Sequence, residues 1–277
     1  MDAASTRRAV QARFAEADPE LPNGFAEHTP MGADALLALG LDPAAVLAWT
    51  ARHEPTPVGP GAPITVRRLA ILADLERLPW DEVLRRNLEG LASHVGAHLF
   101  HGLIRTAHAV RCLRAGGDDP AALGELATAL AAWHIWAGTA DGPAGDSSGP
   151  TTAAPRETIL DAARRGAGAC AAKPSIVTIH AVTAPMAFLL VADLVDTATF
   201  GAAAVAFGHT HARYPAPPAS DRTARPGADH LATLLDHWDA HPAKLSEAAL
   251  RGFDTTGDGV FLDAMAAITG PWTTTAS

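Results

Sequence analysis

The sequence predicts an all-α protein. Apolar residues recur at three- and four-residue intervals through long stretches rich in Ala, Leu, Arg and Glu, which is typical of amphipathic helices. The β-branched segment Ser175–Ile179 resembles a strand, but no alternating partner strand exists elsewhere in the chain, so it is also expected to be helical. The 277 residues, 48% of them apolar, suffice for a core. We expect a single-domain multi-helix bundle over residues 1–277, with an internal cavity for a metal ion and a substrate.

Each predicted helix is a periodic stretch between breaks. In chain order, the expected helices are Thr6–Ala17, Gly32–Leu39, Asp42–His53, Ile64–Leu75, Pro79–Ala115, Pro120–Ala137, Pro155–Ala171, Ser175–Phe207, Ala228–Trp238 and Pro242–Phe253. Three stretches rich in Pro, Gly and Ser are expected to be flexible surface loops: Pro55–Pro63, Gly138–Pro155 and Tyr214–Gly227. The middle loop is a possible domain boundary, but the histidines of interest lie on both sides of it, and a shared site requires one domain.

Composition and charge exclude several classes of protein. The net charge is −9 and no basic block appears, so we expect no nucleic-acid partner. The first twenty residues mix charges of both signs, unlike a secretory signal, and the longest apolar run, Ala184–Ala192, is too short for a membrane span. We expect a cytoplasmic protein. The two cysteines, Cys112 and Cys170, have no CxxC spacing, so a metal site would use nitrogen and oxygen ligands.

Histidines are abundant, with 13 in the chain, and several share a predicted helix face. Five polar residues in the predicted helix Pro79–Ala115 follow one another at offsets of four, three, four and three residues: His94, His98, His101, Arg105 and His108. Buried imidazoles are costly unless each finds a partner, which a metal ion or a polar cavity would supply. The alternative is a solvated polar face with a few hydrogen-bonded core histidines.

A second group contains His237, His241 and Lys244, one of only two lysines. Pro242 makes His241 look like the residue just before a helix, with Lys244 in its first turn. Because a cation is unfavourable at a helix N-terminus, either Lys244 pairs with Glu247 or it is not a plain ammonium. A neutral lysine can take up carbon dioxide and become a carbamate, an anionic oxygen ligand.

The remaining histidines are weak signals when taken singly. His28 and His180 stand alone, and the pair His209 and His211 would either chelate a metal or cap a helix end. Neutral imidazoles suit iron, copper or zinc. The segment from Asp254 begins like a calcium loop, but Met265 occupies the twelfth position, where such a loop needs a glutamate, so we interpret it as a polar turn.

Four short segments, in this order, together resemble the questin oxidase-like family. They are His28–Met31, Phe100–Arg111, Ile179–Pro185 and His241–Leu245, and they span nearly the whole chain. Members of that family are oxygenases of fungal and bacterial aromatic polyketide pathways, which open the central ring of anthraquinones or make Baeyer–Villiger-type insertions. Some were described as NADPH-dependent, and at least one branch is a non-haem iron enzyme with four histidines and a carboxylated lysine as ligands.

The resemblance implies specific roles for residues of this chain. The metal ligands would be His28, His101, His180, His241 and Lys244, the last as a carbamate. His108 would lie behind the ligands or face the substrate. Many relatives are longer, so we expect the loops that shape their substrate pockets to be missing or compact here. Fungal relatives often carry histidines where Met31 and Arg105 stand in this chain.

The function expected from this reading is oxidative cleavage of a polycyclic aromatic polyketide by Fe(II) and O2. His108 or His211 would act as the base that deprotonates a hydroquinone or anthrone-like substrate, and Arg105 would hold the phenolate or enolate. One rival is a metal-free, NADPH-dependent Baeyer–Villiger-type monooxygenase, although the chain has no Gly-x-Gly-x-x-Gly turn. A metal hydrolase would need a His-Asp or His-Glu-x-x-His motif, which is absent. A third rival is a non-catalytic helical protein that binds a polyketide.

Overall fold

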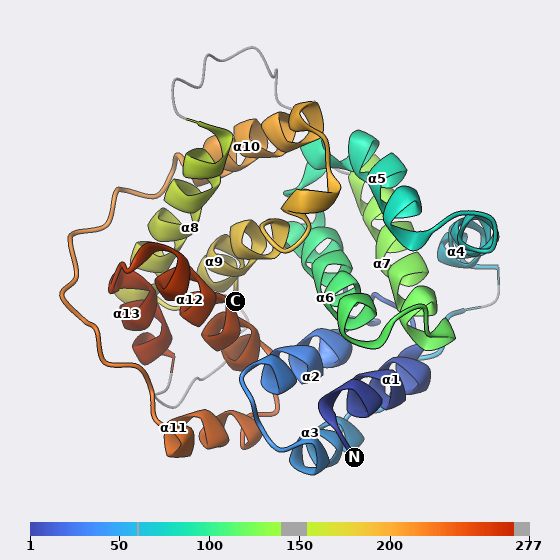
Figure 1. The fold of residues 1–277 in the computed structure, drawn as a ribbon, viewed down its shortest axis with the longest axis horizontal. Helices are drawn as coiled ribbons and strands as arrows, with labels where there is room; N and C mark the ends of the chain where they lie inside the picture. Colours follow the sequence, from blue (N-terminus) through green and yellow to red (C-terminus); the bar gives the residue numbers. More distant parts are fainter. Residues whose placement is uncertain (60, 140–153, 269–277) are drawn as a thin grey trace.

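A computed structural model describes residues 1–59, 61–139 and 154–268 of the chain (Figure 1). Within these ranges there are thirteen α-helices and several short 3-10 turns, and no β-strand, which confirms the all-α prediction. The helices are α1 (Ala3–Phe14), α2 (Thr29–Ala38), α3 (Pro43–Ala51), α4 (Pro63–Leu75), α5 (Trp80–Leu91), α6 (His101–Gly116), α7 (Pro120–Thr139), α8 (Pro155–Ala172), α9 (Ile176–Phe188), α10 (Thr197–His211), α11 (Ala228–Ala232), α12 (His241–Thr256) and α13 (Val260–Ala267).

Four helices form the inner part of the molecule. Helix α2 packs against α6 and α12, and α9 also packs against α6 and α12, so the four close a ring. Figure 1 shows the other helices around this ring, with α4, α5 and α7 on the side of α6 and with α8, α10 and α13 on the side of α9. Each inner helix is buried along most of its length. No helix of the described ranges combines the length and the apolar composition that crossing a membrane requires.

Glycines let the inner helices approach their neighbours closely. A Cβ on Gly166 of α8 would lie 2.3 Å from the carbonyl oxygen of Ala181 in α9. A Cβ on Gly32 of α2 would lie 2.6 Å from the Cβ of Ala240, the residue before α12. Both distances are too short for any side chain, so these two contacts bring backbones together at points next to histidines of α9 and α12.

The prediction of one helix over Pro79–Ala115 is wrong. Helix α5 ends at Leu91, two short 3-10 turns follow, and α6 begins at His101. Three consecutive residues of the second turn, His98, Leu99 and Phe100, have φ values of 45°, 53° and 67°. This left-handed backbone is costly for residues other than glycine, and helix periodicity does not extend through it. His94 and His98 therefore do not share a helix face with the histidines of α6.

The predicted helix Ser175–Phe207 is also two helices, α9 and α10, separated by residues 189–196. The Asp196 side chain accepts a hydrogen bond from the backbone N–H of Thr199 and so caps α10. The β-branched start of α9 is helical, as predicted, and a reciprocal pair of hydrogen bonds between Ser175 and Thr178 caps it. Helix α13 was not predicted. The polar turn from Asp254 forms the end of α12 and the connection to α13.

Two of the three predicted loops are non-helical in their described residues, apart from Pro63, which begins α4; residue 60 lies outside the described residues. Residues 55–59 and 61–62 lead into α4, and residues 212–227 run along α8 and α13. The second loop is held by an Arg222–Asp263 ion pair of 2.7 Å and by a hydrogen bond of 3.0 Å from Arg165 to the Tyr214 carbonyl. Residues 140–153 of the third loop lie outside the described residues. The division of the chain into a single domain stays a prediction.

Candidate metal centre

Four histidines, three in inner helices and one directly before α2, converge at one point. His28 directly precedes α2, His101 and His241 are the first residues of α6 and α12, and His180 lies in the second turn of α9. One ring nitrogen from each lies within 4.8 Å of the others. The Nε2 atoms of His28 and His101 are 2.7 Å apart. These are the four histidines that the family resemblance selected as ligands.

The outer nitrogens of three of these rings face oxygen atoms. His101 Nδ1 lies 2.5 Å from the His98 carbonyl oxygen, His180 Nδ1 lies 2.8 Å from the Ile176 carbonyl oxygen, and His241 Nδ1 lies 2.6 Å from Asp239 Oδ1. These acceptors favour a proton on Nδ1, which leaves the Nε2 lone pairs directed at the shared point.

Two of those Nε2 atoms, on His180 and His241, are buried and have no hydrogen-bond partner among the described residues. An unpartnered buried nitrogen costs free energy unless something satisfies it. A metal ion at the shared point would satisfy both.

The electrostatic setting keeps these imidazoles neutral. Burial lowers the pKa of all four histidines, and the nearby Lys244 is the next cause of the low pKa of His28, His101 and His241. Burial raises the pKa of the Asp239 carboxyl, but the hydrogen bonds from the His241 ring and backbone N–H, together with the charges of His241 and Lys244, outweigh it and bring that pKa to about 2. Neutral imidazoles with a carboxylate behind one of them are the form in which histidine binds metal ions.

Lys244 lies one turn after His241 on α12 and is 1% exposed. Its Nζ has no hydrogen-bond partner among the described residues, and burial lowers its pKa from 10.5 to about 7. The expected alternative, a Lys244–Glu247 pair, is wrong. Glu247 binds Arg111 of α6 and Arg251 of α12 instead. An amine with a pKa near 7 has a substantial neutral fraction at neutral pH, and the neutral amine is the nucleophile that carbamate formation requires.

His108 lies on α6 two turns beyond His101, outside the cluster. Its Nδ1 is 2.7 Å from Asp34 Oδ2, and Arg111 and Arg7 also bind this buried carboxylate. Burial lowers the pKa of His108, so the ring is neutral. His108 Nδ1 thus lies between the Asp34 carboxylate and Arg111 Nη2, a guanidinium donor 3.0 Å away.

Arg105 and His211 have partners that were not expected. The Arg105 guanidinium makes two hydrogen bonds to the Glu125 carboxylate, of 2.7 and 3.0 Å, in the core between α6 and α7. Its Nη1 is buried without a partner among the described residues. His211 Nε2 lies 2.9 Å from the Ala181 carbonyl oxygen, and its Nδ1 faces the Thr210 hydroxyl at 2.9 Å. Both ring nitrogens of His211 are therefore engaged.

Of the other histidines, His209 is exposed at the end of α10, and His94 bonds the neighbouring Ser93 hydroxyl. Neither belongs to the four-histidine cluster.

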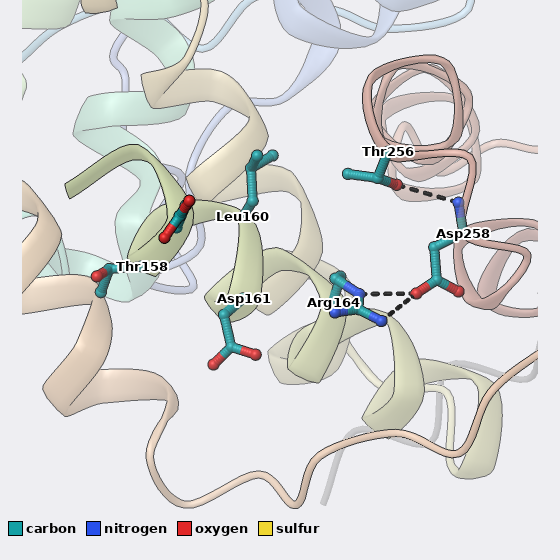
Figure 2. Close-up of a pocket in the computed structure, with 7 residues that line it drawn as sticks. Thr158, Leu160, Asp161, Arg164, Thr256 and Asp258 are labelled. Atoms are coloured by element: carbon teal, nitrogen blue, oxygen red, sulfur yellow. Dashed lines mark hydrogen bonds and ion pairs between the residues drawn. The ribbon is translucent and has the colours of Figure 1, made fainter. Parts of the chain in front are cut away.

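The larger of two described pockets lies away from the histidines. Figure 2 shows it between α8 and the end of α12, with an Arg164–Asp258 ion pair along one side. Its volume is about 670 Å³. From His241 to Thr256, α12 runs about 22 Å at ~1.5 Å per residue, so this pocket and the cluster lie near opposite ends of that helix. The large pocket is therefore not part of the candidate centre.

Two further residues belong to the surroundings of the centre and were not singled out in the sequence. Asp239 orients His241, and its position two residues before a histidine was a weak signal. Trp136 of α7 has its ring centroid 6.4 Å from that of His101, and nothing in the local sequence connects it with a histidine of another helix.

Comparison of the chain with protein-family models, with curated proteins and with solved structures finds no match. The family resemblance therefore stays a prediction, and the geometry of the centre carries the functional argument.

Proposed function

We propose that this chain is a non-haem iron-dependent oxygenase that cleaves a ring of a polycyclic aromatic polyketide. The observation that carries the proposal is the convergence of four buried histidine nitrogens, two of them without any other partner among the described residues. An all-imidazole donor set suits a first-row transition metal and does not suit magnesium or calcium, which prefer oxygen ligands.

Iron at this point would supply the one-electron chemistry that lets dioxygen react with a closed-shell aromatic molecule. The ligands in the proposal are His28, His101, His180 and His241, joined by Lys244 as a carbamate. The low pKa of the Lys244 amine and its lack of a partner among the described residues support this last role, because a carbamate would add the anionic ligand that the histidines do not provide.

The chain's other residues orient the ligands and handle protons. The oxygens of His98, Ile176 and Asp239 hold three imidazoles in one tautomer. Within the proposal, His108 is the better candidate for the base. In the tautomer whose Nδ1 donates to Asp34, Nε2 is the atom that accepts a proton, whereas both nitrogens of His211 are already engaged.

Arg105 enters the proposal with a smaller role than the sequence suggested. Most of its guanidinium is committed to Glu125, and only Nη1 remains to hold a phenolate or enolate oxygen.

Metal analysis tests the proposal most directly. Protein purified without oxygen and supplied with Fe(II) should hold one iron per chain, and His101→Ala should lose it. His209→Ala is the matched control, because His209 is exposed and outside the cluster, and it should keep the metal. Equal iron binding by wild type and His101→Ala, or no iron binding by wild type, would refute the proposal.

Cofactor dependence distinguishes the remaining candidates. Turnover that requires NADPH and resists metal chelators would favour the metal-free monooxygenase. A protein that binds an aromatic polyketide, holds no metal and turns nothing over would be a binding protein. Growth of a carbamate signal on Lys244 with isotopically labelled CO2, absent in Lys244→Met, tests the fifth ligand separately.

A further inference from the structure

A second pocket, of about 470 Å³, is lined in part by Trp136, whose ring also lies edge-on to the cluster histidine His101. Its walls are the segment before His28, the start of α4 and the last part of α7. The lining residues are Asp18, Pro19, Glu20, Leu21, Pro22, Gly24, Ala62, Pro63, Ile64, Ala132, Ile135 and Trp136. We call this the arm pocket, and we call residues 18–27 the arm. Its volume falls in the range of ~300–1,000 Å³ that is usual for small-molecule sites.

The arm has a defined backbone and leads directly to a cluster histidine. It folds back on itself through hydrogen bonds from Leu21 N–H to the Phe25 carbonyl and from Gly24 N–H to the Leu21 carbonyl, and Gly24 adopts a φ of 80°. The residue that follows the arm is His28. One wall of the arm pocket is thus continuous in sequence with the metal centre.

Trp136 joins the pocket to the centre in space. Its indole N–H donates a hydrogen bond of 3.0 Å to Glu20, which ties α7 to the arm. Its ring stacks on His98 with centroids 4.4 Å apart and lies edge-on to His101. Since the His98 carbonyl faces His101 Nδ1, Trp136 contacts both a cluster histidine and the residue that orients it. The arm pocket and the metal centre share this one wall.

The lining sets the chemistry of the ligand. Most of it is apolar, and Trp136 adds an aromatic surface. The charged groups among the described lining residues are two carboxylates, Asp18 and Glu20, with no lysine or arginine. An anion would therefore be repelled, whereas a hydroxyl group can donate to a carboxylate oxygen.

We propose that the arm pocket binds a flat, uncharged aromatic molecule that carries a hydroxyl group, and that the metal centre receives its substrate from this pocket. The supply of substrate to the metal centre rests on the proposed function, whereas the binding of such a molecule in the arm pocket does not.

The binding half is tested with two probes that differ in charge, β-naphthol and β-naphthoate. Titration calorimetry on the wild-type chain should show binding of β-naphthol and at least about tenfold weaker binding of β-naphthoate. Ile64→Trp, which fills the pocket, should weaken β-naphthol binding at least tenfold. Val66→Trp, on the exposed side of the same helix, is the matched control and should bind as wild type does.

A second variant keeps the test valid if Ile64→Trp does not fold. Glu20→Gln removes one carboxylate but retains an oxygen for the Trp136 N–H, so it should reduce the preference for β-naphthol at least about threefold. Asp229→Asn removes an exposed charge on α11 and should leave the preference unchanged. Absence of β-naphthol binding, equal affinity for both probes, or an unchanged preference in Glu20→Gln would overturn the assignment.

The delivery half is tested by nuclear magnetic resonance on chain loaded with Co(II) or Zn(II). Proton lines of bound β-naphthol should broaden with Co(II) and not with Zn(II), and Ile64→Trp should abolish the effect. Equal line widths with the two metals would refute delivery. If the chain holds no metal but binds β-naphthol as described, the proposed function fails and the arm pocket stands. If it holds iron but binds no β-naphthol, the arm pocket fails and the metal centre stands.

Discussion

Adding one methyl group at Gly166 should loosen the fold and weaken the metal centre together. The new Cβ would lie 2.3 Å from the Ala181 carbonyl oxygen, where ordinary contacts are 3.4 Å or more. Helix α9 would have to move from α8 by about 1 Å, since neither contact atom belongs to a flexible side chain. Overpacking of this kind costs about 1–3 kcal/mol, whereas replacing a helical glycine by alanine gains only about 0.5–1 kcal/mol.

The expected result for Gly166→Ala is a net loss of about 1–2 kcal/mol in the free energy of unfolding of the metal-free chain. Because His180 neighbours Ala181, the same movement displaces a cluster nitrogen, and metal affinity should fall about tenfold. Urea unfolding measures the first quantity, and competition with a chromophoric chelator measures the second.

Gly201→Ala is the matched control, because Gly201 lies in α10 and a Cβ there has no heavy atom within 4 Å. This variant should gain up to about 1 kcal/mol in stability and keep its metal affinity. Gly166→Ala with wild-type stability and wild-type metal affinity would refute the reasoning.

Three further outcomes are expected. Lys244→Met should make the metal-free chain about 2–4 kcal/mol more stable in urea unfolding, because it removes a buried amine that has no hydrogen-bond partner among the described residues. The same variant should bind metal more weakly. A metal-free Lys244→Met chain less stable than wild type would contradict this. Burial raises the pKa of the Glu247 carboxyl, but its two arginine partners outweigh burial and lower that pKa from 4.5 to about 2. The ionised carboxylate therefore contributes its full stabilisation above pH 4.5 and loses it as the pH drops towards 2. The stability difference between wild type and Glu247→Gln should therefore shrink over that range in urea unfolding, and a constant difference would count against it. Glu125→Gln should destabilise the chain by about 3 kcal/mol, because it leaves the buried Arg105 without its carboxylate, and should leave the iron content unchanged. The control Asp74→Asn breaks an exposed ion pair and should change the stability by less than about 1 kcal/mol.

Helix periodicity and helix-favouring composition were sufficient to predict the fold class and most of the helices, although inner helices such as α2 and α9 are buried along most of their length and have no single apolar face. It was not sufficient at residues 98–100. Histidine tolerates a left-handed backbone better than most residues, but Leu99 and Phe100 do not, and the contacts that accompany this conformation come from elsewhere in the fold. They are the stacking of His98 on Trp136 and the approach of the His98 carbonyl to His101, neither of which has a local sequence signal.

The four histidines of the centre were named through the family resemblance, and the structure brings them together. Spacing alone would have selected others, because His94 and His98 matched the helical repeat better than His28 or His180 did. The predicted Lys244–Glu247 ion pair does not form, for a related reason. An i,i+3 spacing makes a pair possible, but Arg111 from another helix takes the carboxylate, and no local rule ranks a partner that lies 136 residues away.

Three helices begin at the cluster, α2 after His28, α6 at His101 and α12 at His241. Each helix start carries a partial positive charge of roughly half an elementary charge. Carboxylates meet two of the three starts: the backbone N–H of Thr29 donates to Glu27, and the backbone N–H of His241 donates to Asp239. The side chains that flank the cluster therefore offset the positive potential of the helix starts, and a cation held by the four imidazoles would owe part of its stability to Glu27 and Asp239, which are not among its ligands.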